Sequence, residues 1–379
     1  MKQNQKIKFA LMSVADIKNY GDTLFPFVAR KKLLKYFPSA EFRFFTPTEC
    51  KLENEKFYKF SIENLSEYKP DVILTIGGEV IHKYNNIVWR EMYHDAVEKP
   101  SDVFFGWLDY PAKYKAWFSV GALDLSLPQD EEITDDELSK LNHIALRGIL
   151  SKKILEKREM MNVNRNLDIV PDIGWTFGKY FKNIFFNLFN MSFKYRFPFI
   201  VNQYIVFNIN WTSIPREIIE DTLMKLNNFS KKKKVKVVIL NVISTYKKID
   251  YNIEDFIKSN KNFIYLNNCS LSEMGALLCG CRFYIGSSLH CAMTTLSSCK
   301  PAALIHSAPL TKFQDMFGHM MRTDLFSNNW NEFQGLLYKL NKEKRKEKAT
   351  RKIYVNFMQK AFDYKFENMV VAIKNNKRG

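Results

Sequence analysis

One short segment of the sequence combines residue types that suit the binding and protonation of an anion. The apolar run 282–285 stops at Gly286, Ser287 and Ser288, and an apolar helical pattern resumes around His290. A buried strand that turns directly into a helix leaves backbone N–H groups without helical partners, and these groups favour an anionic ligand. The two serines add hydroxyls, and an imidazole titrates near neutral pH. This segment is therefore the best candidate for an active site.

The same residues also have structural interpretations, and these stay open at the level of sequence. Ser287 or Ser288 can cap the helix that follows. His290 can hold the turn through a hydrogen bond from a buried position. Capping and ligand binding are compatible with each other.

The first half of the chain carries a polar turn after its first apolar run. Residues 7–14 form that run, and Asn19 and Asp22 follow it where a helical pattern begins. Asp22 is in position to cap this helix, and capping alone would explain it.

A second polar turn, Gly77-Gly78-Glu79, follows the apolar run 72–76. Glycine lets the backbone approach a ligand closely, although a tight turn that needs positive φ explains the pair equally well. Neither turn has the G-x-G-x-x-G pattern of dinucleotide sites, and the chain has no G-x-x-x-x-G-K-[ST] loop. The sequence therefore argues against a nicotinamide-cofactor site and against a P-loop nucleotide site.

Composition narrows the class of protein. With 379 residues and 46% hydrophobic content, the chain is long enough and apolar enough for two compact domains. Its formal charge of +17 suits a nucleic acid, an anionic membrane or a phosphorylated substrate, but a solvated basic surface explains the charge as well. Because the sequence has neither a basic helix-turn-helix pattern nor an aromatic–basic RNA-binding signature, we expect no nucleic-acid partner.

The first apolar run, the lengths of the apolar stretches and the cysteines indicate the cellular compartment. The first apolar run is short and reaches Asp16 without a small-residue cleavage pattern, so we expect a β-strand there and no signal peptide. No stretch of about 20 apolar residues occurs, although the aromatic segment 181–207 is suited to touching a membrane. Five of the six cysteines lie between 269 and 299 without the spacing of zinc sites, which indicates buried thiols and no metal. We expect a cytoplasmic protein that can associate with the inner membrane face.

Apolar β-like runs alternate with helical patterns twice along the chain, which predicts an α/β fold with two Rossmann-like, doubly wound domains. The expected strands are 7–14, 41–45, 72–76, 116–120, 143–146, 167–170, 204–209, 235–240, 263–265, 282–285 and 302–305. We expect domains at 1–177 and 204–343, a crossover at 178–203, and at 344–379 a C-terminal helix and basic tail that packs back. Because such sheets bind ligands at the carboxyl ends of their strands, the cleft between the two sheets is the expected site.

Several short motifs, taken in order, resemble the polysaccharide pyruvyl transferase family. They are Asn19-Tyr20-Gly21-Asp22, Ile76-Gly77-Gly78-Glu79, Leu146-Arg147-Gly148-Ile149-Leu150-Ser151, Val170-Pro171-Asp172, Gly286-Ser287-Ser288-Leu289-His290 and Lys312. The resemblance covers the chain from the first strand to about residue 317. It implies a fold like the glycosyltransferase-B type, with phosphoenolpyruvate as the donor substrate and no further cofactor. The implied product is a pyruvate ketal on a sugar of a surface glycan, and the implied acceptor is a saccharide or a lipid-linked saccharide.

The resemblance and the chemistry of phosphoenolpyruvate together suggest a role for each candidate residue. His290 is the expected catalytic acid or base. The expected donor-binding residues are Gly286, Ser287, Ser288, Arg147 and Lys312. The expected acceptor or cleft residues are Asn19, Asp22, Gly77, Gly78, Glu79 and Asp172, where Asp172 either binds an acceptor hydroxyl or caps a turn.

Ser288 departs from a common pattern of the family. Many members carry an arginine two residues before the histidine, where it can pair with phosphate or carboxylate, and others have a Ser-Leu-His version like this chain. A hydroxyl supplies no charge, so Arg147 and then Lys312 are the cations expected to serve the donor. The alternative function is a glycosyltransferase that uses a nucleotide-activated sugar, since two Rossmann-like domains suit it equally.

Overall fold

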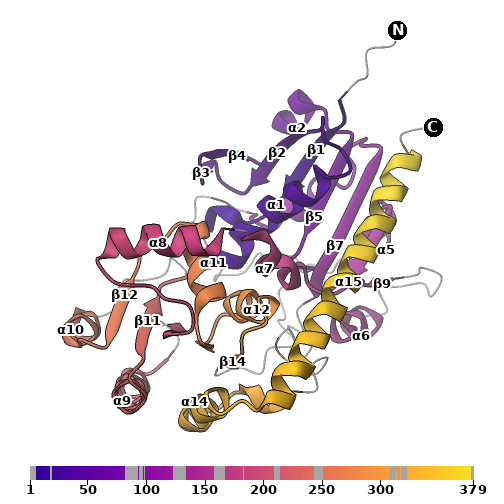
Figure 1. Ribbon diagram of the computed structural model, residues 1–379. Coiled ribbons are helices and arrows are strands. Elements are labelled where there is room, and N and C mark those ends of the chain that lie inside the picture. The colour runs from indigo at the N-terminus through magenta and orange to yellow at the C-terminus, as the bar shows by residue number, and fades with distance from the viewer. Residues whose placement is uncertain are drawn as a thin grey trace. The chain divides into compact units, whose positions relative to one another are not determined.

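The computed structural model consists of two compact units (Figure 1). The first contains Met1–Ile173 and Met358–Gly379, and the second contains Gly174–Phe357. The structure describes residues 6–17, 19–81, 93, 97, 99–122, 134–157, 167–181, 183–208, 214–242, 251–306, 313, 316 and 322–376.

The first unit is built on one sheet. Its strands are β1 (Lys8–Met12), β2 (Glu41–Thr46), β3 (Cys50–Leu52), β4 (Glu55–Lys59), β5 (Val72–Ile76), β6 (Glu79–Ile81), β7 (Tyr114–Ala122), β8 (His143–Leu146) and β9 (Asp168–Ile169). They take the order β3-β4-β2-β1-β5-β7-β8-β9, with β6 paired to β7, and among the described strands β3 and β4 form the antiparallel pair. The run β4-β2-β1-β5-β7-β8, counted along the chain, has the 3-2-1-4-5-6 order of the Rossmann fold.

Helices cover both faces of this sheet, because successive side chains of its strands point to opposite sides. On one face the ring of Trp117 in β7 lies 5.2 Å from Phe105 of α4 (Asp102–Phe105). On the other face the ring of Phe118 lies 5.7 Å from Phe362 of α15 (Arg345–Asn376). The further helices of the unit are α1 (Tyr20–Leu33), α2 (Ile62–Tyr68), α5 (Asp135–Ser139) and α6 (Ile149–Lys157). Strands buried on both faces read as nearly continuous apolar runs, as β5 does.

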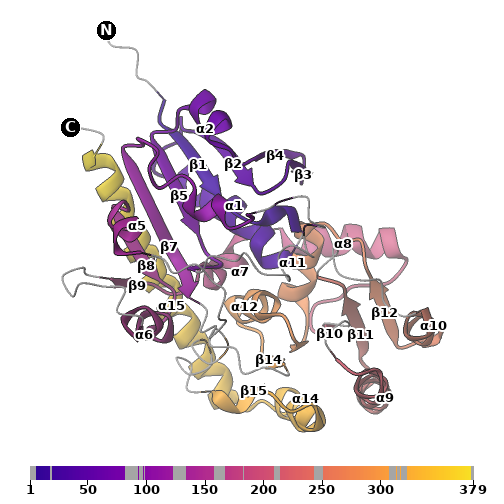
Figure 2. The ribbon, with the colours of Figure 1, turned by 180° about the vertical axis from the view of Figure 1, so that it is seen from behind.

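The second unit has a sheet in which every described strand pair is parallel. Its strands are β10 (Tyr204–Asn208), β11 (Lys236–Leu240), β12 (Phe263–Leu266), β13 (Tyr284–Gly286), β14 (Ala302–Ile305) and β15 (Phe326–Ser327). Figure 2 shows β10, β11 and β12 side by side, and the full order β12-β11-β10-β13-β14-β15 is again 3-2-1-4-5-6. Its helices are α7 (Phe177–Tyr180), α8 (Ile184–Tyr195), α9 (Arg216–Lys233), α10 (Tyr251–Ser259), α11 (Leu271–Gly280), α12 (Leu289–Ser297), α14 (Phe333–Asn341) and the first part of α15.

The predicted α/β class with two Rossmann-like domains is confirmed, and each expected strand is present within a few residues of its expected bounds. The sequence analysis missed the short strands β3, β4, β6 and β15. The two units divide between Ile173 and Gly174, near the expected boundary at 177. Segment 178–203, expected as a crossover, lies in the second unit and contains α8. No helix of the described ranges is long and apolar enough to cross a membrane.

Candidate functional site

Three of the polar motifs lie at the topological switch point of their sheet, where the connections from two neighbouring strands run in opposite directions. In the first unit this point is between β1 and β5, and the turn at Asn19 and the turn at Gly77 follow these two strands. In the second unit it is between β10 and β13, and Gly286 ends β13. Ligands of open α/β sheets bind outside the carboxyl ends of strands at such a point. Each unit therefore has one candidate ligand-binding edge.

At the β10–β13 switch point, Gly286 sits where no side chain fits. It pairs with Asn208 across the two strands, and a Cβ on it would lie 2.3 Å from Asn208 O and 2.6 Å from the Tyr284 hydroxyl oxygen. Glycine is required here because of this close approach, with no need for a positive φ. Burial raises the pKa of Tyr284 well above its ordinary value, so its phenol stays protonated and can donate a hydrogen bond.

Ser287 and Ser288 are held by hydrogen bonds within the second unit. The Ser287 N–H donates to Asn208 O at 3.1 Å, and its hydroxyl donates to Asn208 Oδ1 at 3.3 Å. The Ser288 N–H donates to the Tyr284 hydroxyl at 3.0 Å. Ser288 is the N-cap of α12, where its Oγ accepts from the Cys291 N–H at 3.4 Å. The capping interpretation of Ser288 is confirmed, and these bonds fix the turn before any ligand arrives.

His290 lies in the first turn of α12, one residue after the helix begins. It is half-buried, and its Nε2 atom is shielded from solvent. Its ring centroid is 6.3 Å from that of Phe177 in α7. An imidazole held beside an apolar ring at a helix N-terminus can exchange a proton with a bound group, while the helix end favours negative charge nearby.

In the first unit the structure corrects one expectation about the start of α1. Asn19, and not Asp22, is the N-cap: its Oδ1 accepts from the Gly21 N–H at 3.3 Å. Asp22 lies within the first turn, where a carboxylate is favoured by the helix dipole. A Cβ placed on Gly78 would lie 3.9 Å from Asp22 Oδ1, so Asp22 faces the turn after β5.

The turn after β5 has the positive φ angles that its glycines were expected to adopt. Gly77 has φ 79° and Gly78 has φ 85°. A Cβ on Gly77 would lie 2.8 Å from the ring of Phe25 in α1, so this turn also packs tightly. The turn directs the chain into β6, whose first residue is Glu79.

Arg147, which follows β8, pairs with two carboxylates of the first unit. Its Nη2 lies 2.9 Å from Glu79 Oε1, and its Nη1 lies 3.5 Å from Asp172 Oδ2. The Arg147 side chain is only 5% exposed. Its guanidinium rests against Gly121, because a Cβ there would come within 2.5 Å of Arg147 Nε. The structure thus brings together three residues that the sequence had only suggested separately.

A β-bulge positions Asp172. The pairing of β7 with β8 shifts register between Phe118 and Val120, and Ser119 there has φ 61°. The Ser119 hydroxyl donates to Pro171 O at 3.1 Å and accepts from the Ile173 N–H at 2.8 Å. Bulges often occur beside functional sites, where they re-aim a side chain. Here the Ser119 hydroxyl in the bulge holds the backbone on either side of Asp172 by hydrogen bonds.

Sequence reasoning missed Asp16, which follows β1 at the same edge. Its Oδ2 accepts from the Thr48 N–H at 2.9 Å and the Thr48 hydroxyl at 2.7 Å, and its Oδ1 accepts from the Tyr93 hydroxyl at 3.0 Å. Burial raises the pKa of Asp16, although these three bonds oppose the shift. Asn208 and Tyr284 were missed as well. The signal that points to Asp16 and Asn208 is that each ends or follows a strand at a switch point.

Two further sequence expectations concern cations and metals. Lys312 lies outside the described residues. Across the parts of the chain that the structure describes, no group of three or more His, Cys, Asp or Glu side chains is arranged to hold a metal ion.

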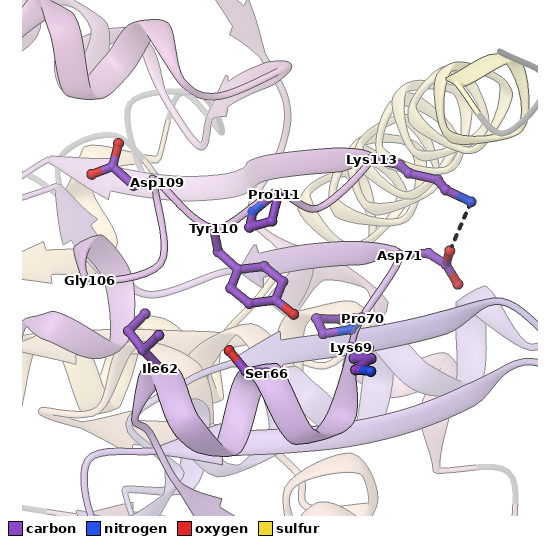
Figure 3. A pocket seen from close by; sticks show the side chains of 10 residues that line it. All are labelled: Ile62, Ser66, Lys69, Pro70, Asp71, Gly106, Asp109, Tyr110, Pro111 and Lys113. Atoms are coloured by element: carbon purple, nitrogen blue, oxygen red, sulfur yellow. Dashed lines mark ion pairs between the residues drawn. The ribbon is translucent and has the colours of Figure 1, made fainter.

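A pocket of about 750 Å³ lies at the edge of the first sheet where β5 and β7 begin (Figure 3). Asp71 and Lys113, which precede β5 and β7, form an ion pair at 3.2 Å on its rim. Tyr110 lies over α2, and its hydroxyl donates to Leu65 O at 3.4 Å. The lining residues are Ile62, Ser66, Lys69, Pro70, Asp71, Gly106, Asp109, Tyr110, Pro111 and Lys113. This pocket contains none of the candidate residues.

Solved structures of similar fold share little sequence with this chain. The UDP-GlcNAc 2-epimerase from Neisseria meningitidis bound to UDP-GlcNAc has a TM-score of 0.62 at 10% identity, covering 97% of this chain and 100% of its own. A glycosyltransferase from Rickettsia africae has a TM-score of 0.56 at 10% identity, covering 98% and 100%. The wall teichoic acid polymerase TagF has a TM-score of 0.54 at 12% identity, covering 99% and 90%. These likenesses show a fold of the glycosyltransferase-B type.

Sequence comparison is more specific about the family. No curated protein matches the chain. The family model described as polysaccharide pyruvyl transferase matches residues 19–307, from the N-cap of α1 to just beyond β14. Because this match spans well over half of the sequence, the chain belongs to the polysaccharide pyruvyl transferase family.

Proposed function

We propose that this protein transfers pyruvate from phosphoenolpyruvate to a sugar of a cell-surface glycan or of its precursor, such as a lipid-linked saccharide of a capsule or exopolysaccharide. The observation that carries the proposal is the position of His290, in the first turn of α12 and directly after a rigid Gly-Ser-Ser turn at the β10–β13 switch point. Membership of the family supports the chemistry.

The reaction needs a proton for the donor and a site for its negative charge. Protonation of the methylene carbon of phosphoenolpyruvate makes C2 electrophilic, two sugar hydroxyls form bonds to C2 in turn, and the bond from C2 to the phosphate oxygen breaks. One hydroxyl proton balances the proton that the methylene gained, and the other leaves with phosphate. We assign the proton transfer at the methylene carbon, or at an attacking hydroxyl, to His290. The N-terminus of α12 favours the donor's phosphate or carboxylate.

Three carboxylates near the carboxyl ends of the strands in the first sheet suit the acceptor. Asp22, Glu79 and Asp172 are hydrogen-bond acceptors for sugar hydroxyls. Arg147 is already paired with Glu79 and Asp172, so we propose that it orients these two carboxylates and does not itself bind the donor. Asn19 and the turn at Gly77 and Gly78 then act by holding the backbone of this edge.

A glycosyltransferase that uses a nucleotide sugar is the second candidate. Two observations favour it: Ser288 supplies no charge for a phosphoenolpyruvate carboxylate, and the epimerase of similar fold is bound to UDP-GlcNAc. A nucleotide sugar and phosphoenolpyruvate differ in size and chemistry, so binding separates the two proposals directly.

The first test is the thermal unfolding of the protein with phosphoenolpyruvate and, separately, with UDP-, GDP-, dTDP- and CMP-sugars. A ligand at about 100 times its dissociation constant adds about 2.7 kcal/mol of stability, which a melting curve detects. Stabilisation by phosphoenolpyruvate alone supports pyruvyl transfer, whereas stabilisation by one nucleotide sugar alone refutes it in favour of glycosyl transfer.

The second test is the turnover of His290→Ala. A general acid or base contributes roughly 10²–10⁴-fold, so turnover should fall by that factor while the melting temperature holds. The matched control is His143→Gln, which alters a histidine at the amino end of β8 in the first unit. Near-normal turnover in His290→Ala would remove His290 from the mechanism.

A further inference from the structure

Helix α8, labelled in Figure 1, belongs to the second unit. It exposes an unusual number of aromatic side chains. Four phenylalanines on this helix are between 64% and 86% exposed: Phe185, Phe186, Phe189 and Phe193. Its other face is buried, with Leu188 and Met191 facing inward where α8 packs on α11. The helix therefore has apolar side chains on both its inner and its outer face, although the fold uses only the inner face.

The exposed phenylalanines form one surface. Phe185, Phe189 and Phe193 are spaced four residues apart, which places them in a row along the helix, and Phe186 lies beside that row. The row spans about 12 Å at the rise of an α-helix. Single exposed apolar residues are common, but a continuous aromatic patch of this kind marks an interaction surface.

The charged residues of α8 and of the segments that flank it in the sequence are all basic. Between Asp172 and Glu217 the sequence contains no aspartate or glutamate, while it contains the cations Lys179, Lys182, Lys194, Arg196 and Arg216. Lys179, Lys194 and Arg196 are exposed, and Arg196 ends α8 in a left-handed conformation with φ 51°. Glu273, the acidic residue of α11, is neutralised by Lys194 at 2.8 Å. This charge complements an anionic surface.

We propose that the outer face of α8 binds the surface of an anionic phospholipid membrane. Phenylalanines on one face of a helix, flanked by Lys and Arg and without acidic residues, are the composition of helices that lie in the interface of a bilayer. The phenylalanines enter the boundary between headgroups and acyl chains, and Lys179 and Arg196 contact lipid phosphates. This inference does not depend on the donor or on the reaction.

A second copy of the chain fits the same face less well. A two-fold dimer brings the same patch of each copy together, so the cations at both ends of α8 would face cations. The described residues of the helix offer no carboxylate to compensate them. Charge thus favours a lipid surface over self-association.

The test is cosedimentation of the full chain with vesicles of phosphatidylcholine containing about 30% phosphatidylglycerol, and with vesicles of phosphatidylcholine alone. We expect binding to the anionic vesicles that weakens with salt. Phe189→Ser with Phe193→Ser should lower the partition coefficient at least about tenfold, since each phenylalanine contributes apolar area. Lys179→Gln with Arg196→Asn should lower binding to anionic vesicles alone, and asparagine keeps the left-handed conformation.

The matched control is Ile353→Ser with Phe357→Ser on α15, since these residues are 71% and 64% exposed but lie on another helix. This pair should bind vesicles like the wild type, and all variants should keep the wild-type melting temperature. Failure of the wild type to bind anionic vesicles overturns the proposal, as does equal loss in the α15 control. A concentration-dependent dimer that the α8 variant abolishes, without vesicle binding, would assign the face to a second copy instead.

Discussion

Replacing Arg147 by glutamine should destabilise the first unit by about 3–5 kcal/mol, the usual cost of removing one partner from a buried ion pair. Arg147 is 7% exposed and is the cation shared by Glu79 and Asp172, whose side chains are only 15% and 8% exposed. Glutamine keeps a similar length and leaves both carboxylates without this charge. The upper part of the range applies because one buried and one partly buried carboxylate lose the same guanidinium.

Gly121→Ala is a second perturbation of the same contact, because its Cβ would come within 2.5 Å of Arg147 Nε and displace the guanidinium without removing its charge. Gly121→Ala should therefore reproduce part of the free energy of unfolding that Arg147→Gln loses.

The assay is urea unfolding, combined with hydrogen exchange at β7 and β8 so that the first unit is observed by itself. The control is Arg216→Gln, which removes an exposed pair with Glu220 at 2.7 Å and should cost under about 1 kcal/mol. If Arg147→Gln is as stable as the wild type while phosphoenolpyruvate binding weakens by about 1.5–3 kcal/mol, the guanidinium serves the donor and the assignment made here is wrong.

Two further changes test the switch point of the second sheet, at Gly286, and the amino end of β8 in the first sheet, at His143. Gly286→Ala should cost about 1–3 kcal/mol or more in urea unfolding, because its Cβ would overlap Asn208 O, whereas Gly335→Ala, with nothing within 4 Å, should be neutral or stabilising. Burial lowers the pKa of His143 despite Asp168 at 3.3 Å, so its folded pKa lies below the unfolded value of about 6.5 and stability should fall as pH drops through that value. His143→Gln should flatten this part of the pH profile of the melting temperature, and an unchanged profile would contradict the assignment.

Most of the fold follows from the sequence because each central strand is buried on both faces. β5 and β10 read as apolar runs with one polar residue each, Thr75 and Asn208, and such runs need no tertiary information to be recognised. The short strands β3, β4 and β6 have no such run. β6 forms because the turn at Gly77 and Gly78 brings the following residues beside β7. This pairing depends on contacts between residues that are far apart in the sequence.

The N-cap of α1 shows why exact roles are harder to predict than elements. Asn19 and Asp22 both have side chains that cap helices, and they are three residues apart. Which of them caps depends on the residue at which the helix begins, and the structure begins it at Tyr20. A polar motif at the end of a strand is therefore predictable, while the partner of each polar atom is not.

The turn after β13 explains why the structural and the functional interpretations of Ser287 and Ser288 do not exclude each other. A site that stabilises developing charge works best when its groups are already fixed, and here Asn208 and Tyr284 fix the turn from β10 and β13. Their partnership depends on the register that pairs Asn208 with Gly286, which the sequence does not reveal. Since the two serines are neutral, the N-terminus of α12 is the positive group that we propose for the donor at the β13 turn. In the proposed reaction, His290 in the same turn of α12 would then lie next to the donor's negative charge.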